Sequence, residues 1–373
     1  EAATTSGAAF ADYDNDGFLD IYVGNWLVEY PYSDSMDDYL FKGNGDGTFV
    51  DVSEESGIRA FTARPCYGVS WADYDNDGDQ DVFAANYGWE PNFLWTNQGD
   101  GTFIDEAPRL GLAIDGPEGT WGGNTFGVDW GDIDNDGDLD VYLAEIAHPR
   151  YLPDTDISRL MVSTGDPHYY FYDDREFRGI TYDEEEIDPS FIDYDNDGDL
   201  DLFLSDHYPN HYARLYRQED DGNFTDVTYM GGISVHDATN HAWADIDRDG
   251  DLDLVISNRD SNSHIYYYRN EVGHRNHWLT IRLTGTDCNR AAIGARVTVQ
   301  SDRGPMMREV QGGKGHFSSQ ASLALEFGLG PYQDVVDLEV RWPCGQVEAF
   351  TGVQADRFLH IVEGTGELEE DPY

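Results

Sequence analysis

Residues 69–84 read Val-Ser-Trp-Ala-Asp-Tyr-Asp-Asn-Asp-Gly-Asp-Gln-Asp-Val-Phe-Ala, and this stretch decides the expected fold. Its centre is the nine-residue pattern Asp-x-Asp-x-Asp-Gly-x-x-Asp, with a short apolar segment on each side. The same pattern begins at five places along the chain: Asp12, Asp73, Asp132, Asp193 and Asp245. Successive copies start 52 to 61 residues apart, and a period of this size indicates a repeat architecture.

Each copy places four carboxylates at loop positions one, three, five and nine. They are Asp12, Asp14, Asp16 and Asp20; Asp73, Asp75, Asp77 and Asp81; Asp132, Asp134, Asp136 and Asp140; Asp193, Asp195, Asp197 and Asp201; and Asp245, Asp247, Asp249 and Asp253. Alternate carboxylates converge when the backbone curls, and the glycine at position six permits the sharp turn. An all-oxygen site suits Ca²⁺, whereas Zn²⁺ takes nitrogen or sulfur ligands. We therefore expect about five bound calcium ions.

A plain turn and an EF-hand both fit these loops less well than a calcium site between strands. Asp, Asn and Gly favour turns without any ion, but four clustered carboxylates would then repel one another for no gain. An EF-hand needs a glutamate at loop position twelve and flanking helices. Position twelve is Val23, Ala84, Leu143, Leu204 or Ile256, and those apolar side chains are typical of strands.

The segments around each loop predict short β-strands. Val69-Ser70-Trp71-Ala72 precedes the second loop and Val82-Phe83-Ala84 follows it, so the loop is expected to connect a hairpin. A third strand follows, Phe93-Leu94-Trp95, and then a glycine-rich turn at residues 97–103. A fourth strand, such as Phe224-Thr225-Asp226-Val227 in the fourth copy, completes the unit. Four strands in each repeat predict an all-β fold, a β-propeller built from four-stranded blades.

At these positions the chain resembles the FG-GAP or VCBS repeats, which form calcium-binding propellers in integrin α-subunit heads and bacterial surface proteins. The resemblance implies a propeller domain over residues 1–275. Five loops imply five blades, but propellers of that family commonly close with seven, and residues 146–186 carry no metal loop. The number of blades therefore stays open.

The sequence pattern changes at His277. From there, strand-like segments with alternating apolar residues and glycine-containing turns predict a small antiparallel β-domain. Five short segments resemble the ASPIC/UnbV domain: residues 276–279, 294–297, 312–315, 327–330 and 340–345. With the propeller, they resemble the cartilage acidic protein and UnbV architecture. We place this domain at residues 276–365 and an acidic tail at 366–373. Cys288 and Cys344 both fall in this part and are candidates to pair, although the sequence leaves this undecided.

The charge of the chain limits its partners. The 373 residues include 74 Asp and Glu against 22 Lys and Arg, a formal net charge of -52. Repulsion argues against nucleic acid and against anionic membranes, and no apolar run approaches the ~20 residues of a membrane helix. We expect a secreted or cell-surface protein, with the periplasm as another location. The scarcity of lysine, Lys42 and Lys314 alone, suggests a saline environment.

The strand order predicts where a ligand would bind. If the metal loops crown one face, the residues after each second strand lie on the opposite face. These residues are Asn25 and Trp26, Asn86 and Tyr87, Glu145, Asp206, and Asn258 and Arg259. Aromatic and polar side chains of this kind are typical of sugar or small-molecule pockets. Alternatively, the polar members cap strand ends and brace the blades.

Two main functional hypotheses follow. The first is a non-catalytic extracellular module that binds a protein or glycan, because no hydrolase elbow, zinc-protease motif, phosphate loop or dinucleotide fingerprint is present. The second is a secreted lyase, dehydratase or hydrolase acting on a sugar or natural product, with His207, His211 or His241 as acid, base or metal ligand. A calcium-dependent structural spacer is a third possibility.

Overall fold

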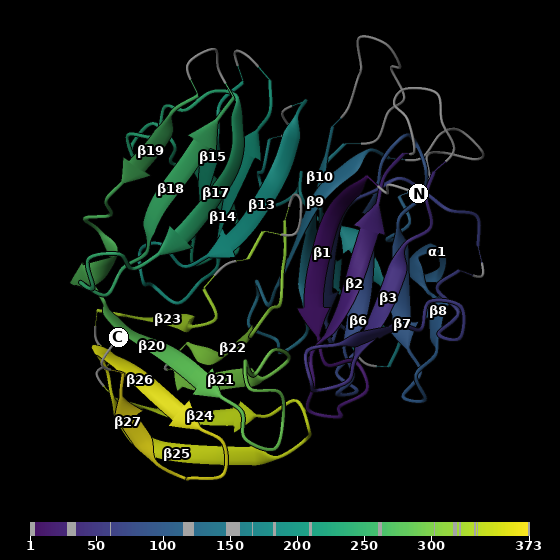
Figure 1. The fold of residues 1–373 in the computed structure, drawn as a ribbon. Helices are drawn as coiled ribbons and strands as arrows, with labels where there is room; N and C mark the ends of the chain where they lie inside the picture. Colours follow the sequence, from purple (N-terminus) through teal and green to yellow (C-terminus); the bar gives the residue numbers. More distant parts are fainter. Residues whose placement is uncertain are drawn as a thin grey trace.

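The computed structural model describes residues 4–27, 35–59, 61–114, 123–146, 157–165, 167–181, 184–208, 211–259, 263–301, 303–315, 319–320, 322–331, 333 and 335–371. The described chain is all-β, as predicted, and its strands form separate small sheets (Figure 1). Two short helical segments, α1 (Ala107–Leu110) and a 3-10 turn at Gly273–Arg275, are its described helices. No described helix is long and apolar enough to span a membrane.

Five sheets follow one another along the repeat region, and we call them blades 1 to 5. Blade 1 holds β1 (Thr5–Ala11), β2 (Asp20–Asn25), β3 (Tyr39–Gly43) and β4 (Phe49–Asp51), and blade 2 holds β5 (Cys66–Ala72), β6 (Asp81–Asn86), β7 (Phe93–Asn97) and β8 (Phe103–Asp105). Blade 3 holds β9 (Thr125–Gly131), β10 (Asp140–Glu145), β11 (Arg159–Ser163) and β12 (Phe171–Asp173), and blade 4 holds β13 (Glu186–Ile192), β14 (Asp201–Asp206), β15 (Arg214–Gln218) and β16 (Phe224–Asp226). Blade 5 shows three described strands: β17 (Ala238–Ala244), β18 (Asp253–Asn258) and β19 (Ile265–Tyr268).

Every Asp loop connects the first two strands of a blade. In blade 2, for example, Ala72 pairs with Asp81 across the loop, and the two strands run antiparallel. Strands rather than helices flank the loops, so the predicted hairpins are confirmed and the EF-hand alternative is excluded. Residues 146–186, which carry no metal loop, supply the outer strands β11 and β12 of blade 3.

The first strands of successive blades pack side by side, from β1 to β5, β9, β13 and β17. Strands of the middle blades are covered on both faces: every residue of β9, β10, β13 and β14 is buried. In blades 1 and 5 the strands β1 and β19 instead show accessible positions alternating with more buried ones. The difference follows from packing, because the middle blades have a neighbouring sheet on each side.

The C-terminal domain consists of two four-stranded sheets. One has the order β23 (Leu325–Gly330), β20 (His277–Thr284), β26 (Arg357–Val362) and β27 (Leu368–Glu370), and the other β22 (Gly304–Glu309), β21 (Arg296–Ser301), β24 (Val335–Arg341) and β25 (Val347–Gln354). The expected all-antiparallel arrangement is wrong at one pair, since β20 and β26 run parallel. Residues 366–373, expected as a separate tail, contain β27, which pairs with β26.

A glycine-rich loop of the C-terminal domain reaches between the first strands of the blades. Gly312 O accepts the N–H of Phe10 in β1 at 2.9 Å, and Gly315 N donates to Val128 O in β9 at 2.7 Å. At its other end Ser319 Oγ accepts a hydrogen bond from Asn240 in β17. A Cβ on Gly312 would lie 1.8 Å from Phe10 O, so only glycine fits there. We call residues 311–315 and 319–320 the axial loop.

Lys314 is the cation of the axial loop. Its Nζ lies 2.7 Å from Asp129 Oδ2 in β9, and the Asp129 side chain is completely buried. The same carboxylate oxygen accepts the N–H of Phe191 in β13 at 2.8 Å. One side chain thus links blades 3 and 4 with the C-terminal domain.

Removal of the Lys314 ammonium should therefore destabilise the whole molecule. We expect Lys314→Ala to lower the free energy of unfolding by about 3 to 5 kcal/mol, because it leaves a buried carboxylate without its cation. Arg357→Ala breaks an exposed ion pair with Glu370 and should cost less than about 1 kcal/mol. Urea denaturation of both variants measures the difference, and equal costs would contradict the structural role of Lys314.

Candidate metal centres and ligand-binding face

The ninth aspartate of each loop is a buried tie between strands. Its Oδ1 accepts the backbone N–H of the residue at the end of the third strand or just beyond it, at 2.7 to 2.8 Å in all five copies. The donors are Gly43, Asn97, Ser163, Gln218 and Asn270. The five carboxylates Asp20, Asp81, Asp140, Asp201 and Asp253 are at most 2% exposed. Each one fixes the third strand of its blade to the loop.

The first aspartate organises the turn itself. In the first copy Asp12 accepts the N–H groups of Asp16 and Gly17, both at 3.0 Å, and Asp132, Asp193 and Asp245 repeat this pair of bonds. The sixth-position glycines have φ between 90° and 100°, as predicted from the need for a sharp turn. The fourth position also has positive φ, at Asn15, Asn76, Asn135, Asn196 and Arg248. The carboxylate pattern does not point to this position, although asparagine tolerates such a conformation and could have signalled it.

The structure brings carboxylates of positions one, three and nine together. Oxygens of Asp12, Asp14 and Asp20 lie within 4.8 Å of one another, and so do those of Asp73, Asp75 and Asp81. Several of these oxygens are buried and have no hydrogen-bond partner among the described residues: Asp14 Oδ1, Asp73 Oδ1, Asp75 Oδ1, Asp81 Oδ2 and Asp195 Oδ1; Asp249 Oδ1, at position five of the fifth loop, is in the same state. Buried acceptors normally find a donor or a metal. The donor set is all oxygen, and it fits a hard divalent cation such as Ca²⁺.

Without a cation the loops would hold carboxylates that resist ionisation. Burial raises the pKa of Asp20 to about 7, and the neighbouring Asp14 and Asp12 add to the shift. Burial likewise raises the pKa of Asp132 to about 7 and that of Asp193 to about 8. The physical cause is the same in each loop: a low-dielectric site crowded with like charge.

Basic side chains from other segments lie close to the Asp loops. The sequence pattern did not predict these contacts. Lys42 Nζ lies 2.9 Å from Asp16, Arg178 lies 3.5 Å from Asp134, and Arg269 lies 3.1 Å from Asp247. Each comes from a strand or turn that the loop faces only in the folded blade. These basic side chains offset part of the negative charge of the Asp loops at the solvent-accessible edge of each loop.

The C-terminal domain docks on the face of the blades that carries the Asp loops. Gly328 N donates to Asp193 Oδ2 at 3.0 Å, and Asn276 Nδ2 donates to Asp195 O at 2.8 Å. Arg341 and Arg296 donate to the second loop, at Asp73 Oδ2 and Asp73 O. The loops therefore form an interdomain surface as well as candidate ion sites.

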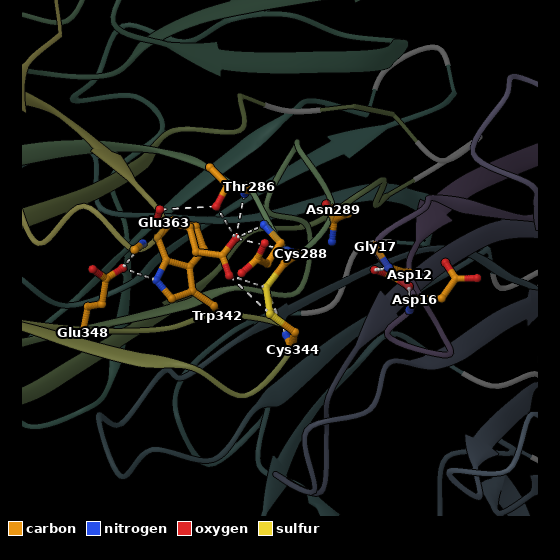
Figure 2. Close-up of a disulfide and its surroundings, with 12 residues drawn as sticks. Asp12, Asp16, Gly17, Thr286, Cys288, Asn289, Trp342, Cys344, Glu348 and Glu363 are labelled. Carbon is orange, nitrogen blue, oxygen red and sulfur yellow. Dashed lines mark hydrogen bonds between the residues drawn. A yellow bond between two sulfur atoms is a disulfide. The ribbon is translucent and has the colours of Figure 1, made fainter.

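The disulfide lies on the side of the C-terminal domain that faces the first Asp loop (Figure 2). Cys288 and Cys344 are bonded, which answers the question that the sequence left open. Glu363 Oε2 accepts the N–H groups of Thr286, Asp287 and Cys288 at 2.7, 2.9 and 3.0 Å. This carboxylate holds the cysteine turn close to Gly17, where a Cβ would lie 3.1 Å from Asp287 O.

The residues after each second strand lie at the other end of the blades, which we call the far face. Their polar members stabilise turns. Asn25 Nδ2 donates to Asp37 O at 2.8 Å, Asn86 Nδ2 donates to Pro91 O at 2.7 Å, and Asn258 Oδ1 accepts the N–H of His264 at 2.8 Å. Glu145 accepts the N–H of Asn124 at 2.6 Å and the Thr125 hydroxyl. These side chains are buried braces, as the alternative to a ligand pocket predicts.

Aromatic side chains gather on the far face near the inner strands. Trp26 lies 5.4 Å from Tyr67 and 6.4 Å from Tyr87, measured between ring centroids. Tyr67 stacks on Phe126 at 4.3 Å, and Phe126 meets Tyr87 edge-on at 5.4 Å. We call Trp26, Tyr67, Tyr87 and Phe126 the aromatic cluster. Blades 1, 2 and 3 each contribute to it.

A repeated β-bulge explains the cluster. The register of the first two strands shifts at the same place in every blade, where the first strand has one extra residue: Ser6, Tyr67, Phe126, Ile187 or Thr239. A bulge re-aims the side chain that it inserts. Sequence reasoning missed Tyr67 and Phe126 because a one-residue bulge leaves no pattern that alternation alone can show.

The candidate histidines fall in two places. His207 follows β14 on the far face, where burial and then Arg259 lower its pKa. His211 lies 3.9 Å from Asp206 and 4.0 Å from Glu185. His241, in β17, lies deeper and contacts Ser190, Ser205 and Asp188. The structure thus groups His207 and His211 with Asp206 and Arg259, and separates His241 from them.

Two family models match the chain. Residues 24–84, 73–143 and 193–256 match the FG-GAP-like repeat, and residues 285–368 match the ASPIC and UnbV model. These matches agree with the resemblance that the Asp loops and the C-terminal segments carry.

Curated relatives are cartilage acidic protein 1 from three vertebrates. The Xenopus tropicalis protein is 28% identical over 336 residues, covering 86% of this chain and 48% of its own length. The mouse protein is 27% identical over 391 residues, covering 97% of this chain and 55% of its own, and the human protein is 27% identical over 362 residues, covering 91% and 50%. The chain spans about half the length of the curated relatives it matches.

A solved structure on recognition of non-reducing terminal N-acetylglucosamine by an Agrocybe aegerita lectin is similar over 71% of this chain and 67% of that chain. The TM-score is 0.38 and the sequence identity 17%. Such a score is too low to establish a common fold.

The raised pKa values predict how the calcium-free protein responds to pH. The carboxylates of Asp12 and Asp20 have folded-state pKa values of about 6 and about 7, above the unfolded value of about 3.9. The folded state then binds more protons, so its stability is greatest at low pH and declines as pH rises from about 4 to about 7. We expect the melting temperature in chelator to fall by roughly 5 °C or more between pH 5 and pH 7.5.

The calcium-loaded protein is the control for this experiment. Because bound cations stabilise the ionised carboxylates, the decline should shrink or reverse when calcium is present. Parallel declines with and without calcium would contradict a role for these loops as ion sites.

Proposed function

We propose that this chain, which carries FG-GAP-like repeats followed by an ASPIC and UnbV domain, is an extracellular calcium-binding module that holds a glycan or protein partner on its far face. The observation that carries the proposal is the fivefold repetition of a loop with four carboxylates, in which four of the copies hold a buried carboxylate oxygen with no hydrogen-bond partner among the described residues. Calcium would be held by the first, third and ninth aspartates, with the fifth at the accessible edge. The ion would neutralise these groups and lock the hairpin of each blade.

An extracellular location agrees with two features of the chain. The Cys288–Cys344 disulfide persists in oxidising compartments. Calcium at the levels found outside cells is enough for sites of modest affinity. The strongly acidic composition also fits a medium rich in cations, because cations reduce the repulsion between the carboxylates.

The aromatic cluster supports a sugar-bearing partner. Tyr67, Tyr87 and Trp26 are partly accessible, whereas Phe126 is buried beneath them. Aromatic faces stack on the apolar faces of sugar rings, and hydroxyl and indole groups supply hydrogen bonds at the rim. Turns braced by Asn25 and Asn86 hold the rings in place, so the platform is largely formed before a ligand arrives.

Titration with calcium tests the ion sites. We expect about five ions per chain by calorimetry, and four for Asp81→Asn, which keeps the hydrogen bond to Asn97 but loses the charge of one loop. Asp46→Asn, an exposed change outside the loops, should keep all five. Unchanged stoichiometry in Asp81→Asn, or no calcium binding in the parent protein, would overturn this part of the proposal.

A glycan array probed with the calcium-loaded chain tests the ligand face. Tyr87→Ala and Trp26→Ala should weaken binding at least tenfold without lowering the melting temperature by more than a few degrees, because both rings are partly accessible. Phe49→Ala removes an exposed ring from the outer strand β4 and serves as the control. Retention of binding in both cluster variants would place the ligand elsewhere.

A further inference from the structure

His241 stands between Ser190 and Asp188 at the boundary of blades 4 and 5, hydrogen-bonded to Ser190 and close to the Asp188 carboxylate. Its Nε2 lies 2.6 Å from Ser190 Oγ, and its Nδ1 lies 3.2 Å from Asp188 Oδ2. Asp188 and Ser190 are two apart in β13, so both side chains leave the strand on the same face. His241 approaches that face from β17. The order of groups is hydroxyl, imidazole, carboxylate.

The rest of the environment fixes the imidazole. Phe203 packs edge-on against the ring, with 4.6 Å between centroids, and Ser205 Oγ lies 3.0 Å from Nδ1. Ser190, Asp188 and His241 are 5%, 2% and 9% exposed. A buried carboxylate beside Nδ1 favours the tautomer with its proton there, which leaves Nε2 free to accept the Ser190 proton.

The trio borders a cavity of about 140 Å³ between blades 3 to 5 and the C-terminal domain. Trp130, Trp243 and Leu325 give it apolar walls, and Lys314 of the axial loop and Arg308 of β22 line it as cations. Arg308 Nη2 is buried and has no acceptor among the described residues. A space of this size compares with the ~150 Å³ cavity that accommodates benzene, so it suits a short acyl chain.

We propose that Ser190, His241 and Asp188 form a hydrolytic centre for small carboxylic esters, with Ser190 as nucleophile, His241 as general base and Asp188 as the residue that positions the imidazole. The apolar walls would hold the acyl group. The spare N–H of Arg308 and the Lys314 ammonium supply the positive charge that an oxyanion requires. This activity is separate from ligand binding at the far face.

The reaction balances without a cofactor. Ser190 Oγ attacks the ester carbon and its proton passes to His241 Nε2. The bond from carbon to the leaving oxygen then breaks, and His241 gives this proton to the departing alkoxide. Water attacks the acyl-serine, loses a proton to His241, and the acid departs as Ser190 Oγ regains its proton. The sum is ester plus water giving acid plus alcohol.

Blade 2 contains a matched control. Ser70 in β5 pairs with Phe83 as Ser190 pairs with Phe203, so the two serines occupy the same position of their blades. Ser70 is fully buried, and its Oγ has no hydrogen-bond partner among the described residues. Ser70→Ala thus removes an equivalent hydroxyl that no described histidine contacts.

The experiment uses the calcium-loaded chain with p-nitrophenyl acetate, and with diisopropyl fluorophosphate as a covalent probe. We expect ester hydrolysis and a probe adduct that peptide mass spectrometry maps to Ser190. Ser190→Ala and His241→Gln should each lower kcat/KM at least 100-fold, while Ser70→Ala should change it less than twofold. Asp188→Asn should lower kcat and leave KM unchanged, because it acts through the imidazole.

Two results would overturn the proposal. One is an adduct on another residue, or none on a folded parent protein whose hydrolysis rate equals that of the uncatalysed reaction. The other is a Ser190→Ala variant that hydrolyses the ester as fast as the parent. Adduct mapping is made on the unmodified sequence, so it decides the question even if a variant fails to fold.

Discussion

The crowding of carboxylates in the Asp loops is the constraint on which the rest of the structure depends. The aspartates at position nine are buried in all five loops and those at position one in the first four, and in the first two loops both lie within 4.8 Å of the carboxylate at position three. The ninth aspartate joins the second strand to the end of the third, so the blade cannot form without burying it. Whatever neutralises that charge therefore stabilises the blade as a whole, and five loops repeat the requirement around the molecule.

The C-terminal domain shares in this neutralisation. Backbone N–H groups of β23 and the guanidinium groups of Arg296 and Arg341 reach the second and fourth loops, and Lys314 reaches Asp129 among the inner strands. Apolar packing also connects the two parts, because one buried hydrophobic cluster contains side chains of blades 1 and 2 and of the C-terminal domain. The two parts are thus coupled by charge and by packing. The cavity beside Ser190 exists because the axial loop closes one side of it.

The two ends of the blades carry different chemistry for a topological reason. First and second strands join at the face that carries the Asp loops, where the chain needs short polar turns and where the C-terminal domain docks. Second strands end at the far face, where turns braced by Asn25, Asn86 and Asn258 hold aromatic side chains. A partner can occupy the far face without competing with the C-terminal domain.

The sequence by itself determined the repeats, the strand-loop-strand order of each blade, the all-β class and the residues of the candidate ion sites. These features are local: the ligands lie within nine residues, and strand alternation shows in a short window. Tertiary structure alone decided which residues far apart would meet. Four contacts depend on how separate sheets and loops pack against one another. They are the stacking of Tyr67 on Phe126, the disulfide between Cys288 and Cys344, the ion pair of Lys314 with Asp129, and the hydrogen bond of His241 with Ser190. The pattern of apolar and polar residues within a strand does not predict such contacts, because the same alternation is compatible with many strand registers and many neighbouring sheets.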